Sequence, residues 1–197
     1  MAPQIIIGCI VSYLLGSIPF SYIVAKMVKG VDIRVVGEGN VGGRNVWHVV
    51  GKKYGALAGG LDFAKGLLAY FVGFWLGLSP WWIWLCGVAV VAGHCFPIFL
   101  RGRGGKGLGS AMGFLTGMEP LLLVIIAAIY GLSYFAFRRF HLSASLGTGS
   151  IPILWLVVFK RSWIEFFIVT GFLILLGIKR LIDEPYMRNI KEVSGGW

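Results

Sequence analysis

Long apolar stretches recur along almost the whole chain and constrain its fold more than any other feature. A helix needs about 20 apolar residues to cross a bilayer, and fewer when it packs against short neighbours. Turn signals that carry proline or charge separate several of the stretches. We therefore predict an all-α integral membrane protein with seven transmembrane helices, some of them short, in a single polytopic membrane domain over residues 1–197. The predicted spans are Gln4–Ala25, Gly55–Leu78, Trp81–Leu100, Gly107–Gly117, Leu121–Phe137, Ser145–Phe159 and Trp163–Ile178.

The composition agrees with a membrane protein and excludes other classes. The chain is 57% hydrophobic and only 13% charged, whereas soluble domains are about 45–50% apolar and about 25% charged. This excludes a soluble globular enzyme, a disordered chain and a disulfide scaffold. The net charge of +10 indicates basic cytoplasmic loops beside anionic lipid, not nucleic acid as a partner.

The distribution of lysine and arginine sets the orientation. With seven spans and an external N-terminus, every Lys and Arg except Lys160 and Arg161 falls on the cytoplasmic side, as the positive-inside rule requires. The stretch Gly107–Gly117 is only about 16 Å long as a helix. A re-entrant half-helix there would invert everything after it and worsen the charge distribution. We therefore predict seven crossings and a cytoplasmic C-terminus.

The first cytoplasmic loop is rich in glycine and polar residues. It reads Gly37-Glu38-Gly39-Asn40-Val41-Gly42-Gly43-Arg44-Asn45. The run matches GxGxxG, but a dinucleotide site needs a βαβ unit around it, and the sequence predicts none. Consecutive glycines can turn backbone N–H groups into a concave anion site, and Arg44 adds a forked donor for phosphate. We predict an anion site; the alternative is a flexible loop.

A later cytoplasmic loop offers a second set of donors. It reads Arg101-Gly102-Arg103-Gly104-Gly105-Lys106-Gly107. We interpret Arg101 and Arg103 as positive-inside charge and Lys106, set among glycines at the start of a helix, as a phosphate ligand. Two such loops on one membrane face predict an anionic, phosphorylated substrate at the cytoplasmic interface.

Other chemical signatures are absent from the sequence. There is no HxxxxD pair, no GxSxG motif and no ligand spacing typical of zinc, so we predict no metal and no cofactor. Asp62 and Lys65 stand three residues apart on one helix, either as an intramembrane functional pair or as a local ion pair. Glycines at every fourth position indicate close helix packing; the alternative is room for a lipid chain beside the helix. They are Gly51, Gly55 and Gly59, and Gly105, Gly109, Gly113 and Gly117.

Motifs over nearly the whole chain resemble the bacterial acyl-phosphate-dependent glycerol-3-phosphate acyltransferases, the PlsY family. The motifs are residues 37–45, 51–55, 61–66, 93–97 and 104–107, and Asn189-Ile190. The resemblance implies an inner-membrane enzyme of phospholipid biosynthesis with its active site facing the cytoplasm, and we expect a monomer. It would move a fatty acyl group from acyl phosphate to the 1-hydroxyl of glycerol 3-phosphate, giving lysophosphatidic acid without a metal. Such chemistry needs alignment and charge neutralisation more than a catalytic triad.

The loops and the resemblance together give the candidate site residues. The catalytic candidates are Glu38, Asn40, Asn45 and Lys106. The candidates for binding phosphate are Gly37, Gly39, Gly42, Gly43, Arg44, His48, Gly104, Gly105, Gly107 and Asn189.

The chain is a divergent member by this resemblance, because several loop positions depart from the family pattern. In the first loop, Glu38 stands where the family has Ser, and Gly43-Arg44 stands where the family has Ala-Thr. His48 stands where the family has Arg. Near the C-terminus, the family has His-Arg-Glu-Asn and this chain has Tyr186-Met187-Arg188-Asn189. Glu38 would repel a phosphate unless Arg44 neutralises it or Glu38 acts as a base on a hydroxyl. Two alternatives follow: a paralogue that acylates another acceptor, or a non-catalytic lipid-binding membrane protein.

Overall fold

The computed structural model describes residues 1–194, and these contain ten α-helices, one short 3₁₀ helix and no strand. They form two compact units. Unit 1 comprises residues 1–117 and 178–194; unit 2 is Met118–Gly177. The helices of unit 1 are α1 (Ala2–Ser17), α2 (Phe20–Lys29), α3 (Gly43–Val49), α4 (Lys52–Trp75), α5 (Pro80–Cys95), η1 (Ile98–Leu100), α6 (Leu108–Met118) and the second half of α10 (Trp163–Ser194).

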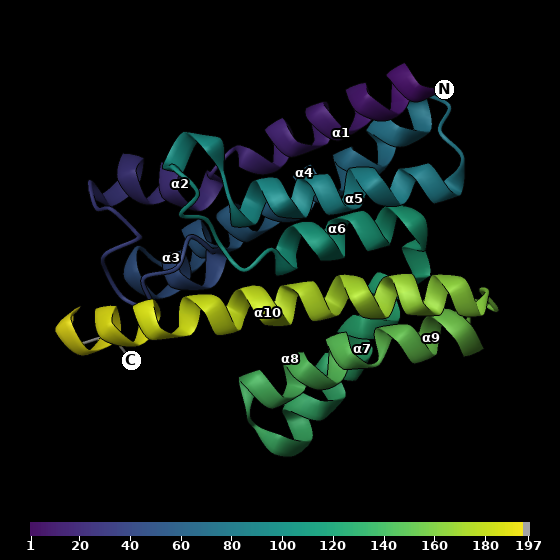
Figure 1. Ribbon diagram of the computed structural model, residues 1–197. Coiled ribbons are helices and arrows are strands. Elements are labelled where there is room, and N and C mark those ends of the chain that lie inside the picture. The colour runs from purple at the N-terminus through teal and green to yellow at the C-terminus, as the bar shows by residue number, and fades with distance from the viewer. Residues whose placement is uncertain (195–197) are drawn as a thin grey trace. The chain divides into compact units, whose positions relative to one another are not determined.

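Helices α1, α4, α5 and α6 of unit 1 lie side by side (Figure 1). Glycines let their backbones come into contact. A Cβ atom on Gly16 of α1 would overlap the Val90 backbone of α5. A Cβ atom on Gly113 of α6 would likewise overlap the Phe63 carbonyl of α4. Small residues therefore set the helix spacing here, as they do in membrane proteins generally.

The first glycine-rich loop contains a helix, α3, that the sequence reading leaves as loop. Gly43 of α3 lies against the backbone of Gly55 and Gly59 in α4, and Gly55 also meets the backbone of Trp47. This confirms close packing at Gly55, whereas a Cβ atom on Gly59 would meet nothing within 4 Å. It also places α3, and with it Arg44, at a fixed position on the side of α4.

Within residues 1–194, five segments are long and apolar enough to cross a membrane: Ala2–Lys29, Lys52–Trp75, Pro80–Leu100, Pro120–Phe137 and Phe140–Val157. The first is interrupted at Ile18-Pro19, between α1 and α2. Helix α6 is apolar but shorter. The predicted last span is the start of α10, which continues to Ser194 with Pro185 inside it. The C-terminal segment that the sequence treats as a tail is therefore helical as far as Ser194.

Unit 2 consists of α7 (Pro120–Phe137), α8 (Phe140–Gly149), α9 (Ile151–Val157) and the first half of α10. Pro120 and Pro152 stand in the first turns of α7 and α9, where the missing amide hydrogen leaves no helical bond unmade. Helices α7 and α8 pack on each other. Arg161 forms an ion pair with Glu119 within this unit.

Candidate active site

Asn45 fixes the shape of the first glycine-rich loop. Its side-chain oxygen accepts a hydrogen bond from the backbone N–H of Glu38 at 2.9 Å. Its side-chain nitrogen donates to the carbonyls of Ile33, Val36 and Asn40 at 3.0–3.1 Å. Asn45 is fully buried, and both ends of its amide are engaged with backbone. These bonds support a positioning role for Asn45 in this loop.

Glu38 links the two glycine-rich loops by charge. Its carboxylate is buried and lies 3.1 Å from Arg44 Nη1 in the first loop and 3.9 Å from Lys106 Nζ in the second. This is the neutralisation by Arg44 that the sequence offers as one of two possibilities. The flanking Gly37 and Gly39 have φ of +61° and +64°, a backbone conformation that a side chain would strain.

Lys106 lies in a partly desolvated, strongly charged environment. Burial lowers the pKa of its ammonium from the ordinary value, repulsion from Arg180 and Arg44 lowers this pKa further, and attraction to Glu38 acts in the opposite direction. Desolvation disfavours the charged form, so a bound anion would recover part of that cost. An incoming phosphate is thus a favourable partner for this side chain.

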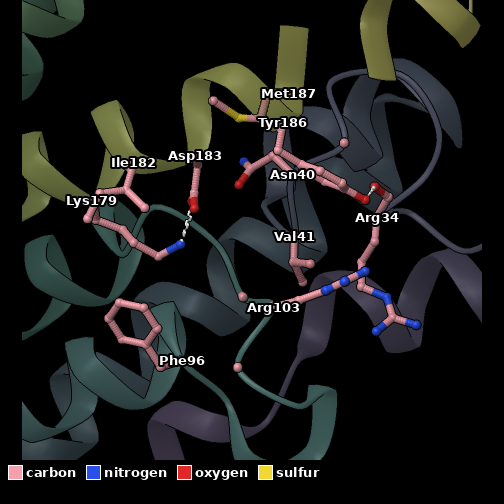
Figure 2. Close-up of a pocket in the computed structure, with 13 residues that line it drawn as sticks. Arg34, Asn40, Val41, Phe96, Arg103, Lys179, Ile182, Asp183, Tyr186 and Met187 are labelled. Carbon is pink, nitrogen blue, oxygen red and sulfur yellow. Dashed lines mark hydrogen bonds and ion pairs between the residues drawn. The ribbon is translucent and has the colours of Figure 1, made fainter. Parts of the chain in front are cut away.

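A cavity of about 300 Å³ opens between the two loops and the second half of α10 (Figure 2). The α10 residues recur every three or four positions, so they share one helix face. Lys179 pairs with Asp183 at 2.5 Å and lies over the ring of Phe96. The lining is Arg34, Gly39, Asn40, Val41, Phe96, Gly102, Arg103, Gly104, Lys179, Ile182, Asp183, Tyr186 and Met187.

Tyr186 and Arg34 connect α10 to the start of the first loop. The Tyr186 hydroxyl donates to the Arg34 carbonyl at 3.0 Å. The Arg34 guanidinium pairs with Asp32 at 2.7 Å and lies over the ring of Tyr22. Hydrogen bonding to Arg34 lowers the pKa of the Asp32 carboxyl. Arg34 is thereby held at the cavity wall.

The structure brings together most of the predicted site residues, in two adjoining groups. Gly39, Asn40 and Gly104 line the cavity. Glu38, Arg44 and Lys106 form the charged cluster beside it and are not part of the lining. The remaining members are Gly37 and Gly42 of the first loop, Gly43 and Asn45 at the start of α3, and Gly105 and Gly107 of the second loop.

Two predicted residues lie at the edge of this arrangement. His48 is exposed in the last turn of α3, and Asn189 is exposed on α10. Neither lines the cavity.

Sequence reasoning missed several cavity residues. Arg103 is interpreted there as positive-inside charge, yet it lines the cavity. Lys179 and Asp183 stand four apart, a spacing that could have indicated a polar face on the C-terminal helix. Phe96 carries no signal of this kind.

Within residues 1–194, no three His, Cys, Asp or Glu side chains gather closely enough to hold a metal ion.

The site can therefore hold an amphiphilic anion. The cations Arg34, Arg103 and Lys179 line the cavity, and apolar side chains such as Phe96, Ile182 and Met187 provide a wall. Such an arrangement suits a phosphate joined to an apolar group.

Comparison with known proteins shows which family the chain is similar to. The family model for glycerol-3-phosphate acyltransferase matches residues 6–190. Glycerol-3-phosphate acyltransferase 4 of Dehalococcoides mccartyi is 35% identical over 154 residues, which is 78% of this chain and 66% of that relative. The Geotalea daltonii glycerol-3-phosphate acyltransferase is 33% identical over 187 residues, which is 94% of this chain and 91% of that relative.

The fold is also that of a solved structure. A crystal structure of PlsY, an integral membrane glycerol 3-phosphate acyltransferase in its glycerol 3-phosphate form, is similar with a TM-score of 0.81. The identity is 31%, over 97% of this chain and 92% of that chain. This chain therefore belongs to the glycerol-3-phosphate acyltransferase family of integral membrane acyltransferases.

Proposed function

We propose that the enzyme transfers a fatty acyl group from acyl phosphate to the 1-hydroxyl of glycerol 3-phosphate, giving lysophosphatidic acid for phospholipid biosynthesis. The observation that carries the proposal is the meeting of two glycine-rich loops, with Arg44 and Lys106 both paired to Glu38 beside the cavity. Solved relatives named as the glycerol 3-phosphate and lysophosphatidic acid forms of PlsY support the choice of acceptor and product.

The reaction asks for little covalent help from the protein. The acceptor oxygen attacks the acyl carbonyl carbon, and the bond from that carbon to the phosphate oxygen breaks. Phosphate leaves with the electron pair and can take the hydroxyl proton. The site then contributes alignment and charge neutralisation, which can supply a large part of the rate enhancement.

The proposal gives each candidate a role. Lys106 and Arg44 neutralise phosphate, and Glu38 holds both cations between the loops. Asn40 and the loop glycines present donors to the cavity, and Asn45 maintains the loop. His48 and Asn189 remain phosphate contacts proposed from the sequence.

We further propose one monomeric domain with seven crossings in the inner, or plasma, membrane. The N-terminus would lie outside, and the C-terminus and both glycine-rich loops in the cytoplasm. The positive-inside distribution supports this orientation. Association of the two loops at one end of unit 1 supports a common side for both.

Purified protein in lipid cubic phase, given palmitoyl phosphate and glycerol 3-phosphate, tests the activity. We expect phosphate release that depends on glycerol 3-phosphate, with Lys106→Ala and Arg44→Ala each abolishing it. Phosphate release that does not depend on glycerol 3-phosphate would favour a different acceptor. The buried Glu38 carboxylate is the structural feature that supports this alternative. Full activity of either variant would contradict the assigned roles.

A further inference from the structure

A second polar cluster lies inside unit 1, outside the lining of the cavity. It consists of Asp62 and Lys65 of α4, Ser21 of α2 and His94 of α5. Their exposed fractions are only 3%, 2%, 1% and 7%. None of the four residues lines the cavity, so none is placed to touch a substrate there.

Lys65 stabilises the break between α1 and α2. Its ammonium donates to the carbonyls of Gly16 at 2.8 Å and Ile18 at 3.0 Å. Pro19 has no amide hydrogen, and the Phe20 N–H bonds to the Ile18 carbonyl. The Gly16 carbonyl therefore has no helical donor from Phe20, and Lys65 supplies one.

Asp62 joins the remaining members. Its carboxylate lies 2.9 Å from Lys65 Nζ, accepts from the Ser21 hydroxyl at 3.2 Å and meets His94 Nδ1 at 3.4 Å. The Asp62 carboxylate and the Lys65 ammonium form an ion pair inside this cluster. Buried charges persist when they are paired in this way.

His94 extends this cluster to both glycine-rich loops. Its backbone carbonyl accepts from the Gly105 N–H at 3.1 Å. A Cβ atom on Gly105 would overlap both His94 Nε2 and the carbonyl of Val41 in the first loop. Gly105 is thus held between the imidazole and the first loop, and Lys106 follows it directly.

We propose that His94 is a positioning residue of the acyltransferase. Anchored by Asp62, it fixes Gly105 and thereby sets the position of Lys106 against the first loop. The prediction about substrate kinetics rests on the proposed function, because it assumes that Lys106 binds a substrate phosphate.

Two substitutions separate the contacts of the ring. In His94→Asn the amide nitrogen takes the place of Nδ1, so the bond to Asp62 is kept and the ring edge beside Gly105 is lost. In His94→Gln the amide lies nearer the position of Nε2, so the bond to Asp62 is lost. We expect His94→Asn to keep the thermal stability of the wild type and to raise KM for glycerol 3-phosphate about tenfold, with kcat changed less. We expect His94→Gln to lower thermal stability.

Hydrogen exchange gives a readout that needs no substrate. We expect faster amide exchange in residues 102–107 of His94→Asn, because the ring no longer restrains the loop. Glu119→Gln is a matched control, since it removes a carboxylate from an ion pair in unit 2. It should leave this exchange and KM unchanged.

The proposal is overturned if His94→Asn leaves both loop exchange and KM at wild-type values. It is also overturned if kcat falls while KM and exchange stay constant, since His94 would then act in the chemistry. Should His94→Asn not fold, Gly105→Ala addresses the same contact from the loop side, with the same expected changes in exchange and KM. A wild type without acyl transfer would refute the proposed function, and the exchange comparison would still decide the role of His94.

Discussion

At the scale of single residues, the charged cluster of Glu38, Arg44 and Lys106 governs how the site meets an anion. Glu38 is buried, whereas the side chains of Arg44 and Lys106 are about one-third and one-quarter exposed. Solvent therefore screens the two ion pairs in part. The carboxylate still restrains two cations that would otherwise repel each other.

Glu38→Gln removes this charge while nearly preserving the side-chain volume. We expect the free energy of unfolding to fall by about 1 kcal/mol in phosphate-free buffer. Added inorganic phosphate should then stabilise the variant more than the wild type, because it replaces the lost counter-charge. Thermal unfolding with and without phosphate measures this, with Glu119→Gln as control. If phosphate stabilises the variant and the wild type equally, Glu38 is not the counter-charge of Arg44 and Lys106.

The lowered pKa of Lys106 makes phosphate binding sensitive to alkaline pH. The ammonium loses its proton at a lower pH than an ordinary lysine, so affinity for glycerol 3-phosphate should fall as the pH rises through that lowered pKa. Lys106→Arg keeps its charge in this range and should bind with a flatter profile. Calorimetric titration between about pH 7 and about pH 10 tests this. Superimposable profiles would mean that Lys106 does not hold the phosphate.

At the scale of elements, the packing of α3 on α4 positions one side of the site. Arg44 and Asn45 lie on α3, whose backbone approaches α4 at Gly43 and Gly55. No side chain fits between the two helices at these positions. Displacement of α3 would therefore move both Arg44 and Asn45.

Gly55→Ala should therefore impair both stability and activity. Its Cβ atom would overlap the Trp47 backbone, and such overpacking costs about 1–3 kcal/mol. Gly60→Ala, on the same helix with nothing within 4 Å of the added atom, is the matched control and should leave both unchanged or raise stability. Thermal unfolding and acyl transfer of the two variants provide the measurement. If the two variants have equal stability and activity, the packing of α3 on α4 does not determine the site.

At the scale of the whole molecule, the proposed orientation depends on whether α6 crosses the membrane. In the part of the chain that the structure describes, five segments are long enough to span, and α6 is shorter. If α6 were re-entrant, every later segment would be inverted. Positions before and after α6 therefore distinguish the two topologies.

We expect Ser79→Cys to react with a membrane-impermeant maleimide from outside intact cells. Arg139→Cys should react only after permeabilisation. Both native residues are exposed, and Cys9, Cys86 and Cys95 are first replaced by Ala. Labelling of Arg139→Cys in intact cells would contradict seven crossings and favour the re-entrant arrangement.

The sequence alone determined the helical membrane class, the two glycine-rich loops and most of the candidate residues. Length of apolar runs, proline breaks and glycine spacing are local properties, so they can be read before any fold is known. The same local signals left α3 as loop, because its helix is short and held by contacts with α4.

Only the tertiary structure decided which residues share the site. The pairing of Glu38 with Lys106, the α10 face of the cavity and the contact of Gly105 with Val41 join segments far apart in the chain. Each depends on how closely helix backbones approach and on which polar groups are buried together. Residue spacing along the sequence encodes neither of these, because both arise from packing among α1, α4, α5 and the second half of α10.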